Sequence, residues 1–65
     1  MMDRYWQRSA KELAMRHAQT SKTCERSLMD AALTACTKRF NLTADEQARW
    51  VTIYRNEFAA EVQEV

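Results

Sequence analysis

The chain has 65 residues and contains neither glycine nor proline. Together these two residues supply about 12% of an average protein, so their absence limits the folds that the chain can adopt. Glycine is the default residue where the backbone turns left-handed, and proline is the usual breaker of helices. Tight β-hairpins and glycine-rich phosphate-binding loops are therefore excluded. Because the composition offers no flexible linker, we predict one all-α domain over residues 1–65.

One helix boundary is clearly marked near residue 42. Thr43 and Glu46 have the spacing of a capping box, in which each side chain bonds the backbone N–H of the other residue. Asn41 is the nearby residue that best tolerates the left-handed conformation of a helix C-cap. Leu42 can then fold back onto the end of the preceding helix. These signals predict a turn at residues 41–43 that joins two helices.

After this turn, apolar residues recur at spacings of three and four, which is the period of one helix face. The pattern predicts a helix over residues 44–64 whose aromatic side chains belong to the core. The apolar face consists of Trp50, Val51, Ile53, Tyr54, Phe58, Val62 and Val65.

Before the turn, a second row steps by four and three residues without losing register. Residues 3–40 could form one long helix of roughly 56 Å. The rest of the chain would then leave the N-terminal half of this helix uncovered, and a second chain would have to cover it, which predicts a dimer. Alternatively the chain breaks at residues 20–23, with Thr20 or Ser21 as N-cap, and forms three helices over 3–19, 22–40 and 44–64. The row consists of Trp6, Ala10, Leu13, His17, Thr20, Cys24, Leu28, Ala31 and Ala35.

We favour the break, because residues 20–23 are all polar and three of them carry hydroxyl groups. Such residues favour caps over helix interiors. The predicted fold is a helical hairpin or a small three-helix bundle, with a turn at 41–43 and a second break at 20–23. A chain below about 70–80 residues usually needs a staple or a partner, and we therefore predict a homodimer.

The sequence offers no set of residues for catalysis, metal binding or a cofactor. Cys24 and Cys36 are twelve residues apart, roughly 18 Å along one helix, which is too far for a disulfide. His17 is the single histidine of the chain, and it lies roughly 10 Å along a helix from Cys24, too far to share a metal ion. We predict no catalytic, cofactor-binding or metal-binding residues and a protein that is not an enzyme.

Signals for membranes and export are also missing from the sequence. No run of about 18 apolar residues occurs, so no transmembrane helix is predicted. Residues 1–6 lack the apolar core of a signal peptide. Because both cysteines are predicted to stay free thiols, the expected location is the reducing cytoplasm.

Charge is divided unevenly along the chain. Residues 1–26 carry six basic and three acidic side chains, a net charge of +3, and residues 27–65 carry four basic and six acidic ones, a net charge of −2. Basic side chains in the first turn of a helix oppose its dipole, so contact with phosphate or with an acidic partner would favour them. The candidate nucleic-acid-binding residues are Arg4, Arg8, Lys11, Arg16 and Lys22.

Aromatic residues at the start of the chain are candidates for a protein interface, because tryptophan and tyrosine are enriched at binding hot spots. The candidate partner-binding residues are Tyr5, Trp6 and Leu13. They favour a small non-enzymatic regulatory or inhibitory protein that docks a helical face on a protein partner. The alternative is a small nucleic-acid-binding or nucleoid-associated modulator that uses the N-terminal basic helix face.

Two parts of the sequence resemble known families. Residues 42–48 are similar to the start of the second helix in the Rop family of plasmid RNA-binding hairpins, which work as dimeric four-helix bundles. A scattered set resembles the Hha/YmoA group of nucleoid-associated modulators, in an alignment that needs a gap of about two helical turns. Neither resemblance supplies residues for a functional site. The scattered set consists of Gln19, Thr20, Thr23, Glu25, Arg26, Leu42, Thr43, Glu46, Ala48 and Trp50.

Overall fold

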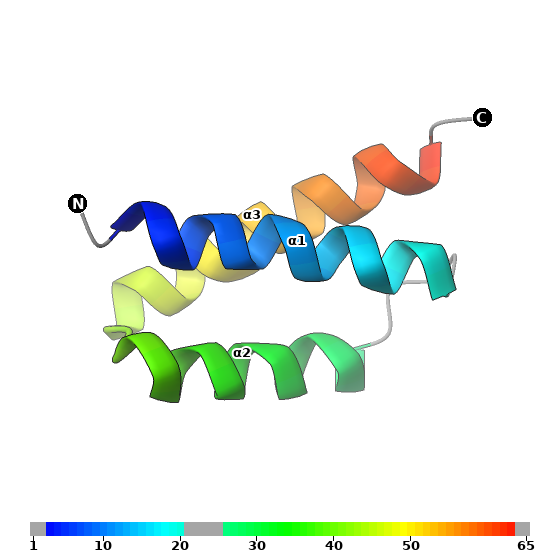
Figure 1. Cartoon of the computed structure of the whole chain (residues 1–65). Coiled ribbons are helices and arrows are strands. Elements are labelled where there is room, and N and C mark those ends of the chain that lie inside the picture. The colour runs from blue at the N-terminus through cyan, green and yellow to red at the C-terminus, as the bar shows by residue number, and fades with distance from the viewer. Residues whose placement is uncertain (1–2, 21–25, 64–65) are drawn as a thin grey trace.

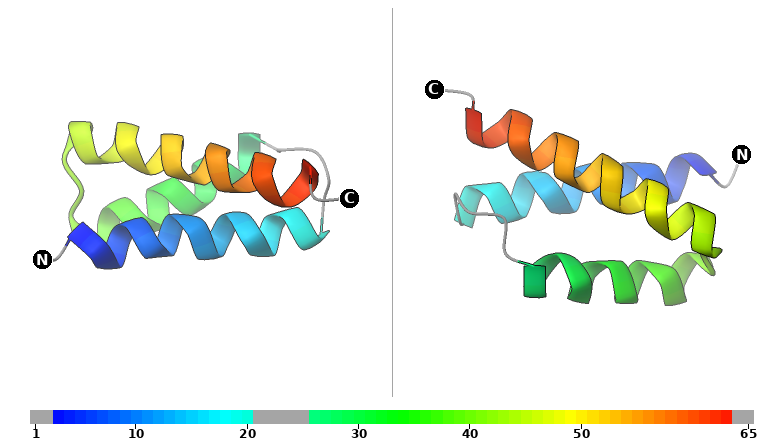
Figure 2. Two further views of the ribbon diagram at one scale, coloured as in Figure 1. Left: turned by 90° about the horizontal axis from the view of Figure 1, so that it is seen from above. Right: turned by 180° about the vertical axis from the view of Figure 1, so that it is seen from behind.

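The computed structural model describes residues 3–20 and 26–63. It contains three α-helices, α1 (Asp3–Thr20), α2 (Arg26–Phe40) and α3 (Ala44–Gln63). Helices α1 and α3 run in the same direction, and α2 runs against both (Figure 1). Helix α1 packs mainly on α3, which lies along it in the left view of Figure 2 and crosses it obliquely in the right view. This arrangement is a small three-helix bundle and confirms the predicted fold class.

The alternative of one long helix is wrong, because α1 ends at Thr20 and α2 begins at Arg26. Thr20 is also not the N-cap of the second helix. Its hydroxyl donates to the carbonyl oxygens of Arg16 and His17, at 3.5 and 3.0 Å, and so it belongs to the last turn of α1. The other predicted cap, Ser21, lies outside the described residues. Since α3 of the same chain covers α1, a second chain is not required to cover it.

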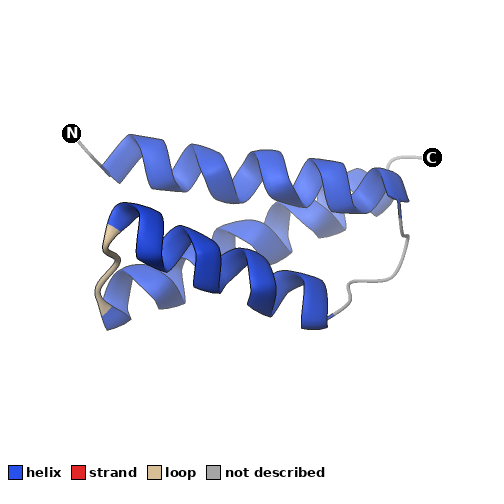
Figure 3. Cartoon of the chain, turned by 60° about the horizontal axis from the view of Figure 1, so that its bottom comes forward, coloured by secondary structure: helices blue, strands red, loops and turns tan. Residues whose placement is uncertain are grey.

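The turn between α2 and α3, drawn in tan in Figure 3, has the predicted geometry. Asn41 has a positive φ of 55°, and the N–H of Leu42 donates to the carbonyl oxygen of Thr37 at 3.2 Å, which is the bond of a Schellman C-cap. The N–H of Thr43 donates to Glu46 Oε1 at 2.8 Å, and the N–H of Glu46 donates to Thr43 Oγ1 at 3.2 Å. The capping box and the left-handed C-cap are therefore confirmed.

The core lies mainly between α1 and α3. Trp50 and Tyr54 are fully buried with their rings stacked, the centroids 5.2 Å apart and the planes inclined by 13°. Phe58 continues the stack at 6.1 Å from Tyr54. The fully buried Ala10 and Ala14 of α1 are small enough to let that helix approach the rings closely. The buried apolar residues are Trp6, Ala10, Ala14, Met29, Cys36, Leu42, Trp50, Tyr54 and Phe58.

The predicted apolar row holds in α1 but not in α2. In α2, Met29 and Cys36 are buried, whereas the residues that the row assigns to the core are exposed. The reason is that the break between α1 and α2 ends the continuous register, so α2 turns a different face toward its neighbours. The exposed row residues are Leu28, Ala31 and Ala35.

Candidate functional site

Basic and apolar side chains share the solvent-facing side of α1. Residues three and four positions apart lie on the same face of a helix, and the opposite face of α1 carries the core residues Trp6 and Ala10. Tyr5 is 68% exposed and Met15 is 40% exposed, so both offer apolar surface on this side of the helix. We call this surface the outer face of α1; its exposed members are Tyr5, Arg8, Lys11, Glu12, Met15 and Arg16.

The outer face of α1 carries a net positive charge. Arg8 and Glu12 form an ion pair one helical turn apart, with Nε and Oε2 separated by 3.8 Å. Both side chains are largely exposed, so this pair contributes at most about 1 kcal/mol to stability. Within the described residues, Lys11 and Arg16 form no ion pair. Three basic groups against one carboxylate leave a charge of +2, which suits an acidic partner surface.

The predicted partner-binding residues lie in three different environments. Tyr5 projects from the outer face, as the interface prediction requires. Leu13 is half-buried and packs against the core. Trp6 is only 2% exposed, because the folded chain itself covers its ring, and its part in partner binding stays a prediction. Of the three residues, Tyr5 offers the largest accessible surface.

Three of the predicted nucleic-acid-binding residues lie together. Arg8, Lys11 and Arg16 are all exposed on the outer face of α1. Arg4 lies in the first turn of the same helix, and Lys22 lies outside the described residues. The structure therefore places part of the predicted basic set on one continuous helix surface.

His17 of α1 lies at the interface with α3. Its Nδ1 atom lies 2.5 Å from the hydroxyl oxygen of Tyr54, and the two rings meet edge to face with centroids 5.6 Å apart. Its predicted neighbour in the row, Cys24, lies outside the described residues. Through these contacts His17 joins α1 to α3.

Cys36 is a buried free thiol, and its Sγ atom lies 3.5 Å from the hydroxyl oxygen of Ser9. Burial limits the access of oxidants and metal ions to this sulfur. In the parts of the chain that the structure describes, no three histidine, cysteine or acidic side chains are grouped as metal ligands.

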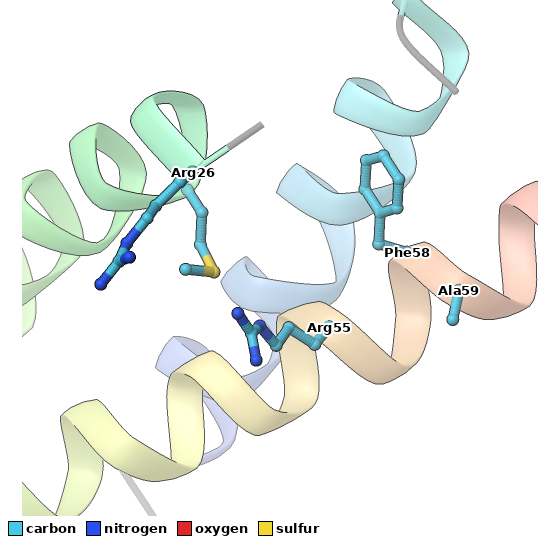
Figure 4. Close-up of a pocket in the computed structure, with 5 residues that line it drawn as sticks. Arg26, Arg55, Phe58 and Ala59 are labelled. Carbon is cyan, nitrogen blue, oxygen red and sulfur yellow. The ribbon is translucent and has the colours of Figure 1, made fainter. Parts of the chain in front are cut away.

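A shallow hollow of about 280 Å³ lies between α2 and α3. Arg26 and Met29 of α2 line it together with Arg55, Phe58 and Ala59 of α3 (Figure 4). No pattern in the sequence predicts this hollow. Its residues belong to two helices far apart in the sequence, so no spacing pattern brings them together.

Comparison of the chain with protein-family models, with curated proteins and with solved structures gives no match. Neither of the two short resemblances is therefore supported by a family match. Over residues 3–20 and 26–63, no helix combines the length and the hydrophobicity that a membrane span requires.

Proposed function

We propose that this protein is a small non-enzymatic regulator or inhibitor that docks the outer face of α1 on a protein partner. The observation that carries the proposal is the 68% exposure of Tyr5 on the same face as Arg8 and Arg16. Tyrosine and arginine belong to the residue types that dominate binding energies at protein interfaces. A tyrosine also loses little conformational entropy on binding, because only two χ angles become fixed.

The chemistry of the outer face indicates the partner surface that it fits. Its net charge of +2 favours an acidic surface, and complementary charge raises the rate of association and fixes the orientation of the two proteins. Tyr5 and Met15 would contact apolar groups within that acidic surface. Lys11 and Arg16, which have no ion pair in the described part of the chain, would gain carboxylate partners on binding.

Packing behind the outer face supports the same function. The opposite side of α1 is held by Trp6, Ala10 and Ala14 in the core, and His17 bonds to α3. A helix face that is already ordered binds without the entropy cost of ordering the chain. The outer face is therefore suited to bind as a preformed surface.

We further propose that the protein acts in the cytoplasm as a homodimer. A 65-residue chain buries only about 60% of the surface that it exposes when unfolded, so association with a second copy would add stability. The opposite net charges of residues 1–26 and 27–65 favour contact between two copies in antiparallel orientation. The free thiol of Cys36 is compatible with a reducing compartment.

Capture of partners on the immobilised protein, from a nuclease-treated extract of its own organism, tests this proposal. The test variant combines Tyr5→Ala with Met15→Ala. The control is Leu28→Ala, which removes a side chain of similar exposure, 36% against 40% for Met15, from a different helix. We expect the captured partner to be lost with the double variant and retained by the control. Equal retention by all three proteins would contradict docking through the outer face.

The alternative function is nucleic-acid binding by the same basic side chains, and it is favoured by the shared exposed face of Arg8, Lys11 and Arg16. Three phosphate contacts would give a slope of about −3 when the logarithm of the binding constant is plotted against that of the salt concentration. Arg8→Glu combined with Arg16→Glu would abolish this binding. If the wild-type protein binds neither DNA nor RNA at low ionic strength, the alternative is excluded.

A further inference from the structure

The hollow between α2 and α3 combines an apolar floor with two guanidinium groups. Met29 and Phe58 are each 5% exposed and form the floor, while the small side chain of Ala59 leaves the hollow open. In Figure 4, Arg26 extends from α2 and Arg55 extends from α3 toward the space between the two helices. The volume of about 280 Å³ is just below the range of ordinary small-molecule sites, so it suits a ligand with few heavy atoms.

The two arginines are available to bind an anion. Arg26 is held only weakly, because its Nε atom lies 4.0 Å from Asp30 Oδ2 and the two side chains are 88% and 60% exposed. Arg55 is exposed and forms no ion pair within the described residues. The planar fork of a guanidinium group matches the two oxygens of a carboxylate. Because Asp30 offsets one of the two positive charges, the local charge of +1 suits a monoanion.

We propose that this hollow binds a small carboxylate that carries an alkyl chain or an aryl ring. The carboxylate accepts hydrogen bonds from Arg55 and Arg26, and the apolar group covers Met29 and Phe58. A short carboxylate such as acetate leaves the floor uncovered, and an uncharged alcohol leaves the guanidinium groups without an anion. This site lies on other helices than the outer face of α1, so the proposal stands independently of the function proposed above.

Titration of the full chain, labelled with ¹⁵N, with octanoate tests the proposal. The amide chemical shifts should give a dissociation constant of about 1 mM, with the largest changes at residues 26–29 and 55–59. Acetate and octan-1-ol are the matched probes, since each lacks one of the two parts of octanoate. We expect each of them to bind about ten-fold more weakly.

Arg55→Gln removes one guanidinium group from an exposed position and leaves the core intact, so the variant should fold. It should weaken octanoate binding about ten-fold and leave the binding of octan-1-ol unchanged. Arg49→Gln is the matched control, because it removes the same group from α3 outside the hollow and should bind octanoate as the wild type does.

Four results would overturn the proposal. The first is binding of octan-1-ol that is as tight as that of octanoate, and the second is an equal loss of affinity in the Arg49→Gln and Arg55→Gln variants. The third is a set of shift changes that lies away from residues 26–29 and 55–59. The fourth is the absence of any change at octanoate concentrations up to about 10 mM.

Discussion

The Nδ1 atom of His17 lies 2.5 Å from the hydroxyl oxygen of Tyr54, so a hydrogen bond joins the last turn of α1 to α3. Either Nδ1–H donates to the hydroxyl oxygen, or the hydroxyl donates to an unprotonated Nδ1. Tyr54 is fully buried, and its ring stacks between those of Trp50 and Phe58. The bond therefore connects α1 to the aromatic core of α3 and holds the helix that presents the outer face.

Loss of the Tyr54 hydroxyl should destabilise the fold. Tyr54→Phe keeps the stacked ring but leaves the Nδ1 atom of the half-buried His17 without this partner. The free energy of unfolding should fall by about 1–3 kcal/mol, as measured by urea denaturation followed by circular dichroism. Tyr5→Phe is the control, because the Tyr5 side chain is exposed and loss of its hydroxyl should change stability little.

A double-mutant cycle of His17→Ala and Tyr54→Phe separates this bond from other effects of the substitutions. The coupling free energy should lie between about 0.5 and 3 kcal/mol. A coupling near zero would mean that the contact between His17 and Tyr54 does not stabilise the protein.

Truncation of Trp6 should lower the free energy of unfolding far more than truncation of the neighbouring Tyr5. Trp6→Ala removes a core side chain that is 2% exposed, and the expected loss is about 3–5 kcal/mol. A 65-residue domain has a total stability of only about 3–10 kcal/mol, so thermal denaturation should show a greatly lowered Tm or no cooperative transition. Tyr5→Ala should stay within about 0.5 kcal/mol of the wild type. Similar losses for the two variants would contradict the placement of Trp6 in the core.

The capping box at the start of α3 should make a measurable contribution. Thr43→Ala removes the acceptor for the N–H of Glu46 and should lower the free energy of unfolding by about 1 kcal/mol. Thr52→Ala is the matched control: its hydroxyl donates to the carbonyl oxygen of Ala48 within α3, and alanine is the better helix former at an interior position. The cap would have no role if both variants had the stability of the wild type.

The proposed homodimer makes a direct prediction about mass. Size-exclusion chromatography with light scattering should give twice the chain mass of 7.7 kDa, with dissociation on dilution. A mass of one chain at every concentration up to the millimolar range would rule out the homodimer without affecting the outer face of α1.

Local determinants explain which parts of the fold could be predicted from the sequence. The turn at residues 41–43 is set by Asn41, Thr43 and Glu46, which act on their immediate neighbours. The aromatic face of α3 follows from the spacing of Trp50, Tyr54 and Phe58 within one helix. Both predictions are confirmed because neither depends on how α1 and α2 are arranged.

Tertiary arrangement explains the predictions that failed. The apolar row already includes Trp6, but its complete burial depends on α3 running alongside α1, and the spacing within α1 does not show which helix covers the ring. The burial of Met29 instead of Leu28 depends on how α2 is rotated after the break. The hollow between Arg26 and Arg55 requires two helices to pack side by side, and periodicity within one helix cannot reveal such a contact.

The dissociation constant of the captured protein partner, measured by calorimetry with purified components, tests docking through the outer face most directly. Tyr5→Ala combined with Met15→Ala should weaken binding by at least about 100-fold, as expected for the loss of a hot-spot side chain and its neighbour. Leu28→Ala should bind as the wild type does. An unchanged dissociation constant in the double variant, with the fold intact by circular dichroism, would contradict the proposed role of the outer face of α1.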